Sequence, residues 1–140
     1  MELLIYLFLL LRDKTSCFYS SFVFLINVLC CFFKKEFMYG LLFLLLFTTS
    51  NFFYTYNDLE PFLYDQLAIF MVVVYGFLFF LSKKKRWMYV LVVLSTFLST
   101  IYLFYYGYMT QSYCYGYYED EWHSVLHGIA SIGHLAILFM

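Results

Sequence analysis

The feature that most constrains this chain is a succession of long apolar segments separated by short clusters of charged residues. An apolar segment of about 20 residues is long enough to cross the hydrocarbon core of a membrane as a helix. Only helices and closed barrels satisfy the backbone inside that core, and continuous apolar runs favour helices over alternating strands. The pattern therefore predicts an all-α fold, a polytopic transmembrane helix bundle.

Five segments are long and apolar enough to act as spans. They cover residues 17–33, 37–56, 62–82, 87–107 and 122–140. An earlier apolar stretch, residues 2–11, is too short to span, and we interpret it as an interfacial or signal-like segment. Because a handful of helices makes one compact bundle, we expect a single transmembrane domain over residues 1–140.

Composition supports a membrane protein and argues against several other classes. The 140 residues are 65% hydrophobic and 12% charged, whereas a soluble domain is nearer to half apolar and a quarter charged. The net charge of −1 argues against nucleic acid as a partner, because nucleic acid requires a basic face. Membrane lipid is the expected partner. The membrane itself, an endomembrane or the mitochondrial inner membrane, stays open.

The charged clusters differ in sign along the chain. The turns at 34–36 and 82–86 carry the lysines, whereas the loops at 57–61 and 108–121 carry only acids. Because basic residues favour the cytoplasmic side, we expect the basic turns there and the acidic loops outside or in a lumen. The end of the second span and the starts of the third and fifth spans then share one side.

Two histidines lie at the start of the fifth span, on the side that carries the acidic loops. His123 and His127 are one helical turn apart on one face, so both can reach one metal ion. Ionisable side chains at membrane depth are rare and usually functional. The second span ends with Ser50 and Tyr54 on one face, and Asp65 opens the third span at a similar depth. This arrangement predicts a polar site that combines a carboxylate with two imidazoles.

The three elements resemble motifs of the CREST superfamily of membrane hydrolases and receptors. That group includes alkaline ceramidases, adiponectin and progestin-type receptors, haemolysin III-like proteins and myomaker relatives. The stretch SNFFY at residues 50–54 is similar to the Ser-x-x-x-His that ends the family's second helix. LYDQL at residues 63–67 resembles the opening of its third helix, and HSVLH at residues 123–127 resembles the His-x-x-x-His of its last helix.

The resemblance implies a zinc site that hydrolyses a lipid amide. His123 and His127 would bind the metal, Asp65 would orient or deprotonate a water molecule, and Ser50 would support the site. In the family a third histidine ends the second helix, but here Tyr54 stands at that position. A catalytic zinc normally keeps three protein ligands, so the third must come from Tyr54, Asp65 or an acid of residues 119–121. The chain also has five spans instead of seven, and losing two crossings preserves the sidedness of the motifs.

Each residue also has a structural interpretation. His123 is consistent with an interfacial histidine, and Asp65 with an acid near a helix N-terminus. Ser50 would ordinarily bond back to its own helix, and Tyr54 would suit an aromatic belt at the membrane surface. His134 lies deeper on the face of the other two histidines, where we expect it to pack or hydrogen-bond between helices.

Two functions of different classes are therefore open. The first is a short, divergent CREST-like protein with a zinc site, either a ceramidase-like lipid amide hydrolase or an inactive relative. The second is a small structural or accessory subunit of a larger membrane complex, such as a mitochondrial respiratory assembly. In the second case the histidines would contact other membrane subunits, a lipid headgroup or nothing.

Overall fold

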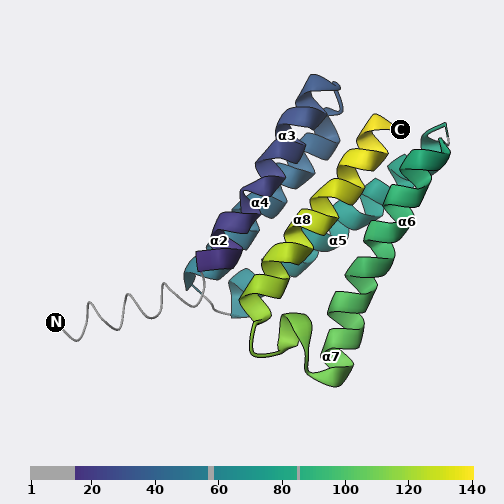
Figure 1. Cartoon of the computed structure of the whole chain (residues 1–140). Coiled ribbons are helices and arrows are strands. Elements are labelled where there is room, and N and C mark those ends of the chain that lie inside the picture. Colours follow the sequence, from purple (N-terminus) through teal and green to yellow (C-terminus); the bar gives the residue numbers. More distant parts are fainter. Residues whose placement is uncertain (1–14, 57–58, 85) are drawn as a thin grey trace.

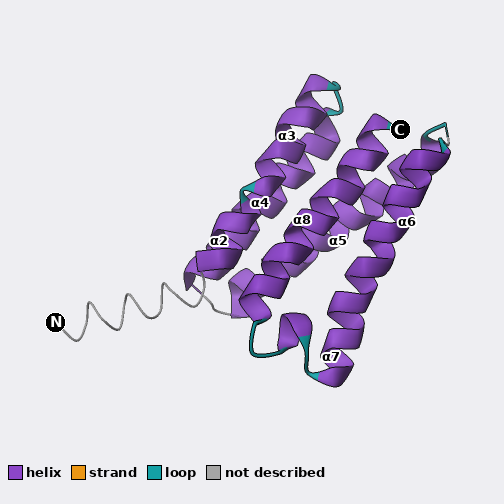
Figure 2. Ribbon diagram, in the orientation of Figure 1, coloured by secondary structure: helices purple, strands orange, loops and turns teal. Residues whose placement is uncertain are grey.

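The computed structural model describes residues 15–56, 59–84 and 86–140. Within these ranges all regular structure is helical, which confirms the predicted all-α bundle (Figure 2). Five helical stretches are long and apolar enough to cross a membrane, and they are compatible with an integral membrane protein. They are Ser16–Phe33, Phe37–Tyr56, Leu63–Ser82, Trp87–Thr110 and Glu119–Phe139. The short apolar stretch at residues 2–11 lies outside the described residues.

The first span consists of two helices with a break between them. One residue, Phe22, separates α2 (Thr15–Ser21) from α3 (Val23–Phe33). At the break, the hydroxyl of Ser20 donates to the Cys17 carbonyl and that of Ser21 donates to the Phe18 carbonyl. Hydroxyls that bond back to the preceding turn compete with the helix ladder and bend it. This pair of serines therefore explains a break that the apolar pattern alone did not predict.

The next two helices agree well with the predicted spans. α4 (Phe37–Tyr56) has the predicted bounds of 37–56, after a tight turn in which Lys35 adopts a φ of 60°. α5 (Leu59–Ser82) begins three residues before the predicted residue 62 and ends at the predicted one. Asp65 consequently lies in the second turn of α5 and not in its first, so the interpretation as an N-terminal acid is wrong.

The fourth span is longer than predicted because the helix continues through the segment that resembled a loop. α6 (Trp87–Ile101) passes into a five-residue π-helix, Tyr102–Tyr106, and then into α7 (Gly107–Thr110). Gly107 sits directly against the turn that ends the span, where its carbonyl accepts from the Ser112 amide at 3.0 Å. A Cβ at Gly107 would lie 2.7 Å from the Ser112 carbonyl oxygen, so only glycine permits this close return.

The last span is α8 (Glu119–Phe139), which begins three residues before the predicted residue 122. Its first turn holds Glu119, Asp120 and Glu121. Acids are favoured at a helix N-terminus, because the backbone amides there carry partial positive charge. A cluster that appeared to close the preceding loop therefore begins the helix.

The helices form an arc in which α8 lies centrally (Figure 1). α5 packs on α4, α4 packs on α3, α2 and α3 pack on α8, and α6 packs on the opposite side of α8. The two basic turns meet at one end, where Lys83 Nζ lies 3.8 Å from Glu36 Oε1. The end of α4 and the starts of α5 and α8 share the opposite end, as the charge pattern predicted.

The main core joins α3, α4 and α5, with one residue from the end of α8. Its buried members are Phe24, Val28, Cys31, Tyr39, Phe43, Leu46, Ala68, Val72 and Leu138. Many large apolar side chains outside this core are exposed, as expected where lipid surrounds the bundle.

His134 of α8 contacts both α4 and α5, deeper in the bundle than the other two histidines. Its Nδ1 is hydrogen-bonded to the Tyr39 hydroxyl of α4. A Cβ at Gly76 of α5 would lie 2.8 Å from the His134 ring and from the Tyr39 hydroxyl, so glycine leaves the space that this pair fills. The prediction that His134 hydrogen-bonds between helices is confirmed.

A second buried pair, Asn27 and Ser131, attaches α3 to α8. Asn27 Nδ2 donates to the Ser131 carbonyl at 3.2 Å, and Asn27 Oδ1 accepts from the Ser131 hydroxyl. We expect Asn27→Ala to lower the free energy of unfolding by about 1–2 kcal/mol, since hydrogen bonds between membrane helices contribute roughly 0.6–2 kcal/mol each.

Unfolding in mixed micelles measures this effect, with Asn27→Ala, Ser131→Ala and the double variant forming a thermodynamic cycle. Ile26→Ala is the control, because Ile26 neighbours Asn27 but is 51% exposed. A coupling energy near zero between Asn27 and Ser131 would contradict the assigned pair.

Candidate functional site

The structure brings together the three side chains predicted to bind metal. The Tyr54 ring of α4 lies against both histidines of α8, with ring centroids 6.2 Å from His123 and 6.0 Å from His127. The two imidazoles have centroids 5.1 Å apart. Tyr54 therefore points into the bundle toward the histidines, which argues against its interpretation as a belt residue.

His127 is the most firmly held of the three. Its Nδ1 lies 2.8 Å from Ser20 Oγ, and its Nε2 lies 3.3 Å from the Tyr54 hydroxyl. The hydrogen of the Ser20 hydroxyl is already donated to the Cys17 carbonyl at 3.0 Å. Ser20 Oγ therefore accepts from Nδ1–H, and the lone pair of Nε2 faces Tyr54. In other proteins, a metal-ligating histidine is held in place by a hydrogen bond from its other ring nitrogen, as Ser20 holds His127 here.

The spacing of these donor atoms fits a tetrahedral ion. Zinc–nitrogen and zinc–oxygen bonds of about 2.0–2.1 Å place neighbouring ligand atoms about 3.3–3.4 Å apart. The observed separation of 3.3 Å between His127 Nε2 and the Tyr54 hydroxyl matches that distance between neighbouring ligand atoms. The same distance also suits a long hydrogen bond, so the pair can exist with or without an ion.

A third conventional ligand does not join the histidines. Within residues 15–56, 59–84 and 86–140, no three His, Cys, Asp or Glu side chains gather closely enough to hold a metal ion. Asp65 and the acids at 119–121 therefore do not complete a site with His123 and His127. Of the three sources considered from the sequence, Tyr54 is the one whose geometry fits, and as a phenol it must lose its proton to bind zinc well.

Asp65 forms a separate polar group between α4 and α5. Its side chain is 3% exposed, and its Oδ1 accepts from Ser50 Oγ at 2.5 Å and from Thr49 Oγ1 at 3.3 Å. Ser50 thus donates across to α5 and not to its own helix, so its predicted back-bond is wrong. Within the described residues, Asp65 does not gather with the two histidines into a metal-binding group. α4 lies directly beside α5 and supplies two hydroxyls, whereas α5 and α8 share a much smaller interface, which includes Gly76 and His134.

Sequence reasoning missed the contribution of α2. Ser20 supports His127, and the Cys17 thiol lies 3.3 Å from the Asp120 carbonyl and 3.7 Å from its Oδ1. Ser16 Oγ lies 2.8 Å from Ser124 Oγ. These small polar residues recur three to four positions apart on α2, a spacing that predicts one helix face and could have indicated contact with α8.

Comparison with protein-family models, with curated proteins and with solved structures gave no match. The resemblance to the CREST superfamily therefore rests on the three sequence motifs and stays a prediction.

Proposed function

We propose that this chain is a CREST-type integral membrane protein that binds one zinc ion through His123, His127 and Tyr54 and hydrolyses a lipid amide. The observation that supports the proposal best is the contact of the three rings, with His127 Nε2 held toward the Tyr54 hydroxyl at 3.3 Å. When bound, zinc would supply a Lewis acid for the amide carbonyl and for water.

The chain's own residues would prepare the site in two ways. Ser20 fixes the His127 ring so that Nε2 faces the site. Ser50 and Thr49 both donate to Asp65 Oδ1 and hold that carboxylate beside α4. Asp65 would take a proton from water and return it to the leaving amine, as a general base and acid that does not itself ligate the metal.

Metal content tests the proposal. Protein purified in detergent and dialysed against trace zinc should contain about one zinc per chain by elemental mass spectrometry. His123→Ala/His127→Ala should contain none, because a histidine pair supplies both nitrogen ligands. His134→Ala is the matched control, since His134 bonds Tyr39 away from the site and its loss should leave the zinc in place.

Hydrolysis is measured separately, as fatty acid released from an N-acyl lipid in vesicles. Metal-free wild-type protein would contradict the zinc site. Zinc-loaded protein without release of fatty acid would contradict the hydrolase activity and assign the chain to the inactive relatives.

A second candidate, an accessory subunit of a larger membrane complex, is favoured by α6. No residue of Trp87–Ile101 is buried within the described structure, and α6 makes its large interface with another span at α8. An oligomer or a partner subunit would cover the side of α6 that faces away from α8. Chemical cross-linking in native membranes tests this function, and cross-links confined to single copies of the chain would contradict it.

A further inference from the structure

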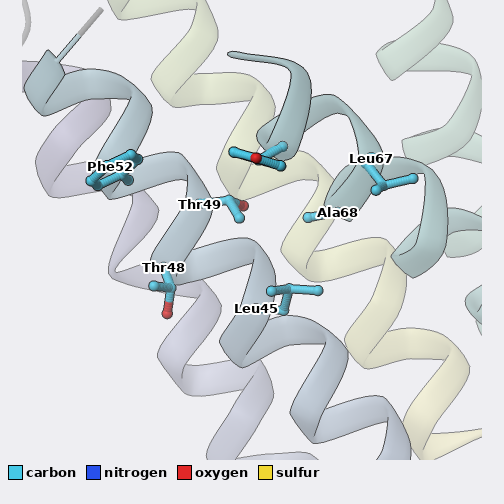
Figure 3. Close-up of a pocket in the computed structure, with 7 residues that line it drawn as sticks. Leu45, Thr48, Thr49, Phe52, Leu67 and Ala68 are labelled. Carbon is cyan, nitrogen blue, oxygen red and sulfur yellow. The ribbon is translucent and has the colours of Figure 1, made fainter. Parts of the chain in front are cut away.

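The parts of the bundle that can select a lipid headgroup are its two ends, because the sides of the spans are largely apolar. Figure 3 shows one such side, where Leu67 of α5 faces Leu45 of α4 across a shallow groove that suits any acyl chain. The ends of the bundle differ in charge. The acids that begin α5 and α8 lie at one end, and the two basic turns lie at the other (Figure 1).

The two basic turns form one surface, because an ion pair joins them. Lys83 Nζ after α5 lies 3.8 Å from Glu36 Oε1 in the turn before α4. Lys34 adds the end of α8 to this surface, since its Nζ lies 4.5 Å from the centroid of the Phe139 ring. Three separate parts of the chain therefore meet here. We call this surface the basic platform, and its described cations are Lys34, Lys35, Lys83, Lys84 and Arg86.

Four cations of the basic platform are available to a ligand. Glu36 is the only acid in the two turns, and Lys83 already pairs with it. The other four cations are exposed, and among the described residues none of them forms an ion pair: Lys34, Lys35, Lys84 and Arg86. An aromatic ring positions the Lys34 ammonium group but carries no net charge to compensate it. Lysine and arginine are the side chains that bind phosphate groups, arginine through two parallel hydrogen bonds.

The surroundings of the basic platform favour a lipid over a soluble anion. Phe33 and Trp87 flank the two turns and are 83% and 80% exposed. Both lie at the ends of spans, at the depth where acyl chains meet headgroups. A lipid can place its acyl chains against these rings and its headgroup over the cations, whereas a soluble phosphate makes only the second contact. The platform also lies on the predicted cytoplasmic side, and anionic lipids concentrate in the cytoplasmic leaflet.

We infer that the basic platform binds the headgroup of a polyanionic membrane lipid, one with at least two phosphate groups, and that both turns hold the same headgroup. A headgroup with a single phosphodiester carries one negative charge and leaves most of the four cations uncompensated. The inference goes beyond the proposed hydrolase, because the platform lies at the opposite end from the histidines and requires no metal.

Quenching of tryptophan fluorescence by brominated lipids tests the inference. The chain has two tryptophans, so Trp122→Phe leaves Trp87, next to Arg86, as the only reporter. The full chain is reconstituted in phosphatidylcholine vesicles with increasing mole fractions of phosphatidylinositol bisphosphate or phosphatidylserine, each brominated in its acyl chains. Each basic residue near an anionic surface strengthens binding about five-fold, so half-maximal quenching should require about ten-fold less of the bisphosphate lipid. Trp87→Phe, which leaves Trp122 as reporter at the acidic end, should show no such preference.

Charge variants in the Trp122→Phe background locate the binding surface. Lys34→Gln/Lys35→Gln and Lys84→Gln/Arg86→Gln each remove the available cations of one turn. If both turns hold one headgroup, either double variant should lose most of the preference, and the quadruple variant should lose little more. Losses that simply add from one turn to the next, or equal midpoints for the two lipids, would show ordinary attraction to any anionic surface and overturn the inference.

Two controls complete the experiment. Glu60→Gln/Glu119→Gln neutralises two acids at the opposite end and should leave the midpoint unchanged. Reversal of the quenching by the soluble inositol phosphate headgroup at the same concentration would assign the platform to a soluble anion and also overturn the inference. His123→Ala/His127→Ala should be quenched like the parent protein, so failure of the basic platform and failure of the zinc site are distinguishable.

Discussion

Gly133→Leu should detach α6 from the rest of the bundle. A Cβ at Gly133 would lie 2.5 Å from Thr96 Oγ1 and 3.2 Å from Thr96 Cβ, so α6 and α8 meet here almost backbone to backbone. The Thr96 hydroxyl is held by the Val92 and Val93 carbonyls at 3.0 Å, which opposes its rotation away from a new side chain. Small residues at membrane helix interfaces permit this close approach, and overpacking typically costs about 1–3 kcal/mol or more. Because α6 has no other large interface within the described chain, no other contact of α6 compensates for the free energy lost at Gly133.

Variants that change the size of the side chains at positions 133 and 96 measure the effect of this contact on stability. Gly133→Ala alone should lower the unfolding midpoint in mixed micelles, and Gly133→Ala/Thr96→Ala should restore most of it by removing the opposing side chain. Gly128→Ala is the matched control on the same helix, since a Cβ there would meet nothing within 4 Å. That control should be neutral or slightly stabilising, because alanine favours a helix by about 1 kcal/mol over glycine. Equal midpoints for Gly133→Ala and Gly128→Ala would contradict the close contact between α6 and α8.

The sequence predicted those parts of the fold that depend on apolar length and charge. The span at 37–56 has the predicted bounds because charged turns flank it on one side and polar residues on the other. The fourth span was predicted to end at residue 107 and the fifth to begin at residue 122, whereas the helices end at Thr110 and begin at Glu119, because Gly107 permits a close turn after the span and the acids at 119–121 occupy a helix N-terminus. The glycine is required by a close backbone return, and the acids by the helix N-terminus. Both are local effects that an average over an apolar window does not detect.

The candidate site was predictable in its depth and in part of its membership. Helical spacing and the charged turns placed Tyr54, His123 and His127 at a similar depth at one end of the bundle, and their rings are in contact. The partner of Asp65 was not predictable, because it depends on which helices are neighbours. Because α5 packs on α4, the Asp65 carboxylate accepts a hydrogen bond from Ser50 of α4 and not from a histidine of α8. Spacing along the chain gives the face of a residue, but not the helix opposite it.

Tyr54→His should raise zinc affinity by about 100-fold or more. With three imidazoles the site would meet the normal requirement of a catalytic zinc for three good protein ligands. An imidazole binds as the neutral side chain, whereas a phenol with an unperturbed pKa of about 10 must first lose its proton. The histidine is also shorter than tyrosine, so its ring leaves space for an ion between itself and His127 Nε2, which lies 3.3 Å from the phenol oxygen in the wild type.

Competition with a chromophoric zinc chelator measures this affinity for wild type, Tyr54→His and Tyr54→Phe in the same detergent. Tyr54→Phe should bind zinc more weakly than wild type by about 10–100-fold, since it keeps the ring but loses the oxygen. Phe53→His is the control for adding an imidazole to the same turn of α4 next to the site, and it should leave the affinity unchanged. If Tyr54→His binds zinc no better than wild type, the contact of the three rings is a packing arrangement. Equal affinity of wild type and Tyr54→Phe would limit the metal ligands to the two histidines and exclude the phenol oxygen from the site.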